Sequence, residues 1–293
     1  MNTILKLTNL TKTYIMGENK AAQKALKEIK KLHKLYEAAC SHDQKKEAKI
    51  LGARLDKAQK FFASEKYIQS FKASTGKTLV VRKPAKGVVV HALRGINLEI
   101  KEGELTAIMG PSGSGKSTLL NMLGLLDEPT SGHVYIREEN ITDIKESRLP
   151  DVRVRELGFV FQSFNLIPTL TALENVMLPL RYSKIPNNKR KKLAEEALKS
   201  VNLGDRMGHN PNELSGGQRQ RVAIARSLVN KPAIIFGDEL TGELDTKMTK
   251  EIMELIVRLN KKGQTFVIVT HNPEVAKLCK RTIVMRDGLV AKK

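Results

Sequence analysis

The sequence predicts an α/β fold in which a mostly parallel sheet is flanked by helices. The first observation is a set of short apolar runs, "LTAIMG", "PAIIFGD" and "TFVIVT", which have the length and composition of buried parallel strands. The second is that glycine loops and helix-period segments alternate with these runs, which is the order of an α/β core. With 293 residues, 41% of them hydrophobic, the chain can bury one core and a smaller attached module.

The composition favours a protein that stays in the cytosol. No apolar stretch approaches the roughly 18 residues of a membrane span. The amino-terminal "MNTILKLTNLTKTY" alternates polar and apolar residues, unlike the continuous apolar centre of a signal peptide. The two cysteines, Cys40 and Cys279, are far apart and lack metal-ligand spacing, so we expect idle thiols.

The positive charge of the chain is concentrated in one segment. The whole chain has 51 Lys and Arg against 31 Asp and Glu, a formal net charge of +20. Residues 20–86 alone hold 18 Lys and Arg against 6 Asp and Glu. Such a segment can face nucleic acid, anionic lipid or an acidic partner surface.

The first third of the chain combines strands with a helical segment. Residues 4–14 read as a half-buried strand. From about residue 21 to residue 71, apolar residues recur at three- and four-residue steps, interrupted by "CSHDQ", so we expect two helices packed as an antiparallel hairpin. The segments "TLVVRK" and "GVVVHALRGINLEI" then predict strands around a turn at "PAKG".

The stretch "GPSGSGKST" has the pattern of a phosphate-binding loop, with a strand before it and a helix after it. Small residues let the backbone N–H groups converge on a triphosphate, Lys116 adds a charge at the β and γ oxygens, and Ser117 offers a hydroxyl to Mg²⁺. The predicted triphosphate-binding residues here are Gly110, Pro111, Ser112, Gly113, Ser114, Gly115, Lys116, Ser117 and Thr118.

Two further motifs carry polar chemistry. The strand "AIIFGDE" ends in Asp238, which can hold Mg²⁺, and Glu239, which can polarise a water for attack on the γ-phosphate. The stretch "ELSGGQRQR" runs into an apolar-periodic helix and places Ser215, Gly216 and Gly217 at its N-terminus, again suited to an anion.

Together these motifs resemble the ATP-binding subunit of ABC transporters. Residues 1–19 and 87–293 carry the resemblance, which implies a P-loop NTPase core, an antiparallel β subdomain, a helical subdomain at about 163–214 and, in this chain, an inserted helical hairpin with a following β segment at 20–86. It also implies roles for further residues: Tyr14 stacks on adenine, Gln162 contacts Mg²⁺ or the attacking water, Gln218 completes the "LSGGQ" signature and His271 contacts the γ-phosphate.

The resemblance is strongest to the lipoprotein-release and macrolide-export branch, through "KTYIMGE", "HALRGINLEI" and "FVFQSFNLIPTLTALENVMLPL". It implies a two-fold dimer in which ATP lies between the phosphate loop of one copy and Ser215–Gly217 of the other. It also implies a separate integral membrane permease, a peripheral place on the inner face of the cell membrane, and export or extraction of peptide, lipoprotein or hydrophobic drug. The cell-division ATPase of the same branch is an alternative.

Two departures from the family pattern stand out. Leu240 follows Glu239 where proline is common, and about 67 residues intervene where a short connection is usual. The basic face of this insertion is either simply solvated or contacts the permease or anionic lipid headgroups beside it. A non-transport ABC protein acting on nucleic acid or the ribosome is a further alternative. The lysine-rich hairpin has only Arg54 and no aromatic platform, which tells against it.

Overall fold

The computed structural model describes residues 2–16, 35, 49–53, 69–72, 78–81, 88–183 and 185–291. The chain divides into two compact units, one formed by Met1–Leu10 with Leu93–Lys293 and the other by Thr11–Ala92. The predicted insertion at 20–86 falls within the second unit, and its boundaries stay a prediction. Most of its predicted helical hairpin lies outside the described residues, although residue 35 and residues 49–53 are helical.

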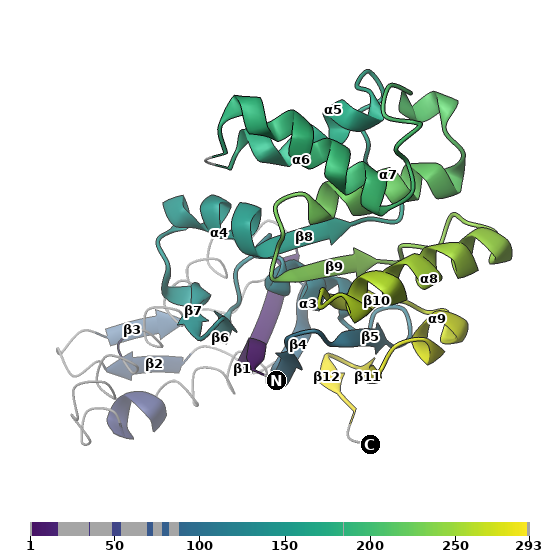
Figure 1. The fold of residues 1–293 in the computed structure, drawn as a ribbon. Helices are drawn as coiled ribbons and strands as arrows, with labels where there is room; N and C mark the ends of the chain where they lie inside the picture. The colour runs from purple at the N-terminus through teal and green to yellow at the C-terminus, as the bar shows by residue number, and fades with distance from the viewer. Residues whose placement is uncertain are drawn as a thin grey trace. The chain divides into compact units, whose positions relative to one another are not determined.

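The first unit contains the predicted, mostly parallel sheet (Figure 1). Its six strands lie in the order β12-β11-β5-β10-β9-β8. Their bounds are Leu105–Met109 for β5, Leu157–Val160 for β8, Ile234–Asp238 for β9, Thr265–Val269 for β10, Arg281–Arg286 for β11 and Leu289–Val290 for β12. Neighbouring strands from β11 to β8 pair in parallel, and only β12 is antiparallel, to β11.

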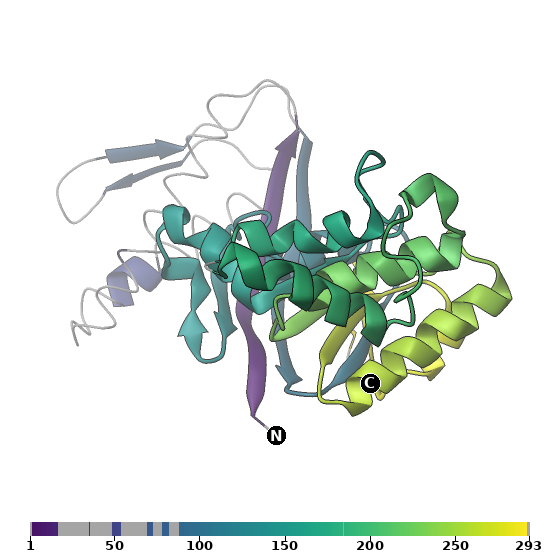
Figure 2. The ribbon, with the colours of Figure 1, turned by 45° about the horizontal axis from the view of Figure 1, so that its top comes forward.

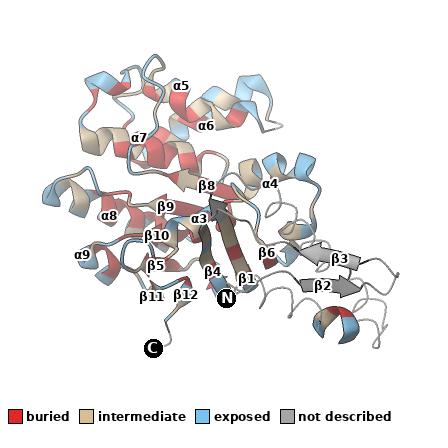
Figure 3. Cartoon of the chain, turned by 180° about the vertical axis from the view of Figure 1, so that it is seen from behind, coloured by how far each residue is buried: buried red, intermediate tan, exposed pale blue. Residues whose placement is uncertain are grey.

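Both faces of this sheet are covered, which explains why its strands read as continuous apolar runs. Ile234 and Phe236 of β9 join one core cluster, whereas Ile235 between them joins the other. Figure 3 shows β9 and β10 as buried strands at the centre of the unit. The first cluster also holds the buried face of α3, and the second holds apolar residues of α5 to α8.

Several helices of the first unit begin at a residue whose side chain caps the helix. Thr171 and Ser215 form capping boxes at the starts of α5 and α7, and Asp245 caps α8. The α-helices are α3 Lys116–Leu123, α4 Leu149–Glu156, α5 Ala172–Met177, α6 Asn187–Ser200, α7 Gly216–Leu228, α8 Thr246–Lys261 and α9 Pro273–Lys277. Short 3-10 helices are η1 Ile141–Asp143, η2 Glu146–Arg148, η3 Pro179–Arg181 and η4 Pro211–Glu213.

Three of these helices form a group beside the parallel sheet. Figures 1 and 2 show α5, α6 and α7 lying together, and each contacts the other two. This is the region where we expected a helical subdomain. None of the helices in the described ranges is long and apolar enough to cross a bilayer.

A second sheet has the order β4-β1-β6-β7 and matches the expected β subdomain. Its strands are β1 Thr3–Met16, β4 Val88–Lys101, β6 Ser131–Ile136 and β7 Glu139–Asn140, and β6 pairs antiparallel with β7. Leu5 and Leu7 of β1 and Ile96 of β4 belong to the same core cluster as α3. Residues of this sheet therefore pack in the same core as α3, the helix that follows the phosphate loop.

The second unit contains a two-stranded hairpin that corrects one prediction. β2 Gln69–Lys72 pairs antiparallel with β3 Thr78–Val81, with Phe71 opposite Leu79. Residues 69–71 were expected to end the second helix, and that expectation is wrong. The partner strand "TLVV" is rich in β-branched residues, so pairing between 69–72 and 78–81 overrides the helical spacing.

The insertion begins and ends on neighbouring strands, which predicts that it can be removed. β1 and β4 are adjacent in their sheet, and Thr13 Oγ1 lies 3.0 Å from His91 Nδ1. A short loop replacing residues 20–86 can therefore join the two strands without spanning a large distance. We expect this variant to be a folded, ATP-hydrolysing protein with a single cooperative thermal transition. Loss of that transition in a calorimetric scan would show that the segment is part of the core.

Candidate functional site

The predicted site residues gather at one edge of the parallel sheet. Because β5, β8, β9 and β10 run in parallel, the segments after their carboxyl ends emerge at the same edge. These segments carry the phosphate loop after β5, Gln162 after β8, Asp238–Glu239 at the end of β9 and His271 after β10. Two backbone bonds tie the edge together: Glu239 N–H donates to Val269 O at 2.9 Å, and Thr270 N–H donates to Ile108 O at 3.1 Å.

The phosphate loop needs glycine for two different reasons. A Cβ on Gly110 would collide with the carbonyl oxygen of Met285 in β11, so the close approach of that strand requires glycine. Gly115 has φ +97° and is the residue immediately before α3, in a conformation that disfavours a side chain. The loop is thus wrapped tightly between β5 and the N-terminus of α3, as anion binding by backbone N–H groups requires.

The Lys116 side chain folds back over this loop. Its Nζ donates to Gly110 O at 2.8 Å and to Pro111 O at 2.9 Å. Both partners are neutral carbonyls, so the ammonium charge has no anionic partner among these bonds. This charge is therefore available to an anion bound on the loop.

The remaining loop residues differ in exposure. Ser114 is 2% exposed, its Oγ has no hydrogen-bond partner among the described residues, and its amide donates to Pro111 O at 3.2 Å. Its contribution to a ligand would therefore come through the shape of the backbone. Pro111, Ser112, Gly113 and Ser117 are exposed, and Thr118 is half-buried.

The carboxylate pair at the end of β9 is electrostatically unusual. Asp238 is half-buried, and burial, then the neighbouring Glu239 carboxylate, raises the pKa of Asp238, while Lys116 opposes the shift. Glu239 has φ +45°, a left-handed conformation that is uncommon for a non-glycine residue. Its Oε1 lies 2.9 Å from His271 Nδ1, so the structure brings these two predicted catalytic residues into direct contact.

Gln162 lies against the turn that follows the carboxylate pair. A Cβ on Gly242 would be 2.8 Å from Gln162 Nε2, so glycine at 242 leaves room for that amide. Gly242 N–H in turn donates to Glu239 O at 2.8 Å. The turn at 239–242 therefore places Gln162 and Glu239 beside one another.

The second glycine motif lies at the N-terminus of α7, as predicted. Ser215 Oγ accepts from Gln218 N–H at 3.3 Å, and Gln218 Oε1 accepts from Ser215 N–H at 2.9 Å. The Gln218 side chain thus closes the helix cap. Gly216 and Gly217 lie against Leu244 and Met248 at the start of α8, beside a pocket of about 390 Å³.

Tyr14 is the one predicted site residue in the second unit. It lies near the end of β1 and is half-buried, with Lys12 Nζ 4.9 Å from the centre of its ring. Its role at the adenine stays a prediction.

Two polar residues of α7, the buried Gln220 and the half-buried Arg226, were not predicted from the sequence. Gln220 is fully buried and donates through Nε2 to Leu240 O at 2.6 Å, while Arg226 donates to the backbone after Gln162. A signal existed for Gln220, because it shares the apolar helix face of Ala223 and Ile224 at three- and four-residue spacing. Leu240, at the position where proline was expected, is 2% exposed and packs against Gly237.

A phosphate loop between a buried parallel strand and a helix, with paired carboxylates at the end of another strand, defines a nucleoside triphosphatase of the phosphate-loop class. Residues 93–242 match the family model described as "ABC transporter". The chain belongs to this family, and it is an ATP-binding and ATP-hydrolysing protein.

Similar proteins extend this match. An uncharacterized ABC transporter ATP-binding protein of Thermotoga maritima is 54% identical over 203 residues, covering 69% of this chain and 87% of that protein. The macrolide export ATP-binding/permease protein MacB of Bdellovibrio bacteriovorus is 50% identical over 201 residues, covering 69% of this chain and 31% of MacB, consistent with the predicted branch.

A solved structure shows the same architecture. It is the dimeric post-hydrolysis state of the ATP-binding cassette MJ0796 bound to ADP and Pi, which is 39% identical to this chain with a TM-score of 0.68. The comparison covers 98% of this chain and 97% of that chain.

Proposed function

We propose that this ATPase powers a separate integral membrane permease from the cytoplasmic face of the membrane, and that the cargo is a peptide, a lipoprotein or a hydrophobic drug. The observation that carries the proposal is the convergence of Lys116, the Asp238–Glu239 pair, Gln162 and His271 at one sheet edge. The similarity to a macrolide export ATP-binding/permease protein supports the transport role.

In the proposed reaction each residue has a definite task. Lys116 and the N–H groups of the loop bind the β- and γ-phosphates of ATP. Glu239 accepts a proton from the attacking water, and His271, in contact with it, holds the Glu239 carboxylate in place and faces the γ-phosphate. Gln162, whose amide lies against Gly242 in the turn after Glu239, orients the same water.

The residues present fit Mg²⁺. Ser117, Gln162 and Asp238 offer a hydroxyl, an amide oxygen and a carboxylate, the oxygen ligands this ion prefers. Asp238 is a half-buried carboxylate whose pKa is raised by burial first and by the neighbouring Glu239 carboxylate second, so its ionised form lacks full compensation. A bound Mg²⁺ would supply that compensation and would neutralise charge on the phosphates.

We propose further that two copies share each ATP. Gly110 of the phosphate loop packs against Met285 of β11. Gly216 and Gly217 instead pack against Leu244 and Met248 near the start of α8. One chain thus presents two anion-binding backbone segments, which pack against different elements of the fold. In a two-fold dimer, the phosphate loop of each copy pairs with the α7 N-terminus of the other. The dimeric state of the similar MJ0796 cassette supports this arrangement.

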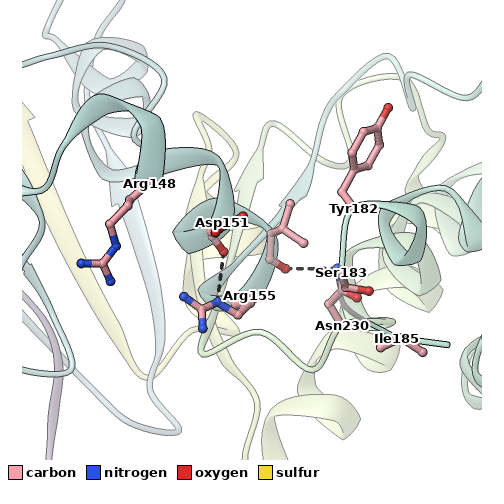
Figure 4. A pocket seen from close by; sticks show the side chains of 8 residues that line it. Arg148, Asp151, Arg155, Tyr182, Ser183, Ile185 and Asn230 are labelled. Atoms are coloured by element: carbon pink, nitrogen blue, oxygen red, sulfur yellow. Dashed lines mark hydrogen bonds between the residues drawn. The ribbon is translucent and has the colours of Figure 1, made fainter.

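A cleft between α4 and the segment after η3 is the surface we assign to the permease (Figure 4). It has a volume of about 540 Å³. Arg148, Asp151 and Arg155 line one wall, and Tyr182 lies on the other with 72% of its surface exposed. A cleft with charged groups on one wall and an exposed aromatic residue on the other suits a short amphipathic segment of a partner protein.

This assignment predicts the effect of one surface substitution. Tyr182→Ser should leave the ATPase rate and the thermal transition unchanged, because the side chain is solvent-exposed, but should reduce retention of the permease by about tenfold. The measurement is purification of the tagged chain from its own membranes in mild detergent, with the retained protein identified and then added back to the ATPase assay.

The matched control is Leu278→Ser, another exposed apolar residue with 49% exposure, which should retain the permease. A permease that stimulates the purified ATPase supports the proposal. Salt-sensitive retention of RNA or DNA with no integral membrane protein would contradict it.

A further inference from the structure

Arg226 of α7 holds the backbone that follows Gln162. Its guanidinium donates through Nη2 to Phe164 O at 2.9 Å and through Nη1 to Asn165 O at 2.5 Å. The planar guanidinium binds these two carbonyls through two separate nitrogens, a rigid fork that the single nitrogen of a lysine does not have.

The two residues held by Arg226 have an unfavourable backbone conformation. Phe164 has φ +57° and Asn165 has φ +50°, so two successive non-glycine residues are left-handed. Arg219, also on α7, lies 5.1 Å above the centre of the Phe164 ring and adds a second contact from the same helix. Such a turn persists only when its surroundings impose it.

The charge of Arg226 reinforces the argument. Burial lowers the pKa of the Arg226 guanidinium, and its hydrogen bonds to Phe164 and Asn165 go to backbone carbonyls rather than to a carboxylate. Desolvating a cation is costly, and the contacts that offset this cost are those to the turn after Gln162.

We propose that Arg226 is a positioning residue for ATP hydrolysis, which fixes Gln162 by holding the left-handed turn at Phe164 and Asn165. Gln162 is two residues before Phe164, so a change in that turn moves the amide relative to Glu239 and Gly242. The inference rests on the proposed role of Gln162 in the ATP site.

The first test is Arg226→Lys, with ATPase kinetics measured on the full-length chain. We expect kcat to fall about tenfold while the KM for ATP changes less than about twofold, because the interaction acts on the attacking water rather than on ATP binding. The matched control is Arg153→Lys, since Arg153 donates to the carbonyl of another left-handed residue, Leu125, which lies outside the turn after Gln162, and its kcat should be unchanged. An unchanged kcat in Arg226→Lys would overturn the inference.

A second pair of variants approaches the same contact from the other side. Asn165 is exposed, so its substitution does not threaten the core. Asn165→Val disfavours the left-handed backbone and should lower kcat about tenfold, whereas Asn165→Gly accepts that backbone and should retain kcat. Equal kcat values for the valine and glycine variants would contradict the inference even if Arg226→Lys fails to fold.

A double-mutant cycle separates this inference from the proposed site itself. If Arg226 acts through Gln162, Arg226→Lys should cost no further activity in a Gln162→Ala background. Additive losses would indicate a general structural role and overturn the inference. Full activity of Gln162→Ala alone would instead show that the proposed role of Gln162 is wrong.

Discussion

Glu239→Gln should bind ATP and hydrolyse it at least about 100-fold more slowly than the original chain, because an amide cannot accept the proton of the attacking water. The substitution preserves the shape of the side chain, and an amide can still hydrogen bond to His271 Nδ1. With hydrolysis blocked and two ATP molecules held between two chains, the variant should also accumulate as a dimer. Single-turnover hydrolysis and size-exclusion chromatography with light scattering measure the two effects.

The control for this prediction is Glu274→Gln, which makes the same chemical change in an exposed residue at the start of α9. It should hydrolyse ATP normally and should not form a stable dimer. Wild-type turnover in Glu239→Gln would exclude Glu239 as the base. A variant that stays monomeric with saturating ATP would contradict the shared sites.

Lys116→Ala should weaken ATP binding by about 10- to 100-fold, because charge-assisted hydrogen bonds contribute roughly 1.5 to 3 kcal/mol each. The loop itself should persist, since the approach of Met285 and the left-handed Gly115 set its shape independently of the lysine. Titration with a fluorescent ATP analogue measures the affinity, and the thermal transition reports on the fold.

The matched control is Lys262→Ala, which removes an exposed lysine after α8 and should leave ATP affinity unchanged. This comparison separates the local charge from the overall charge of +20, which could itself attract a polyanion. ATP binding of equal strength in both variants would remove Lys116 from the site.

The sequence was sufficient for the parts of the fold and the site that depend on local pattern. The buried strands β5, β9 and β10 carry continuous apolar runs, the left-handed position before α3 needs the glycine at Gly115, and the cap of α7 needs Ser215. Each of these is dictated by residues within a few positions of one another. The convergence of their ends followed from parallel topology alone.

Contacts between distant segments could not be predicted in the same way. The strand at 69–72 depends on its partner at 78–81, and the bonds from α7 to Phe164 and Leu240 join residues that share no local signal. The left-handed backbone of Glu239 was equally hidden, because glutamate does not favour that conformation. What the sequence could not supply was the set of side chains that hold the catalytic turns in place.

Helix α7 gives the proposed dimer a way to coordinate its two halves. Its N-terminus would face the partner's nucleotide. Further along the helix, Gln220 hydrogen bonds to the turn after Glu239, and Arg226 hydrogen bonds to the turn after Gln162. A regular helix of 13 residues resists bending, so a tilt imposed at its N-terminus would move the Gln220 and Arg226 contacts together. Nucleotide occupancy at the partner's site would then reach both turns through this helix. The two sites of the dimer would therefore hydrolyse ATP cooperatively rather than independently.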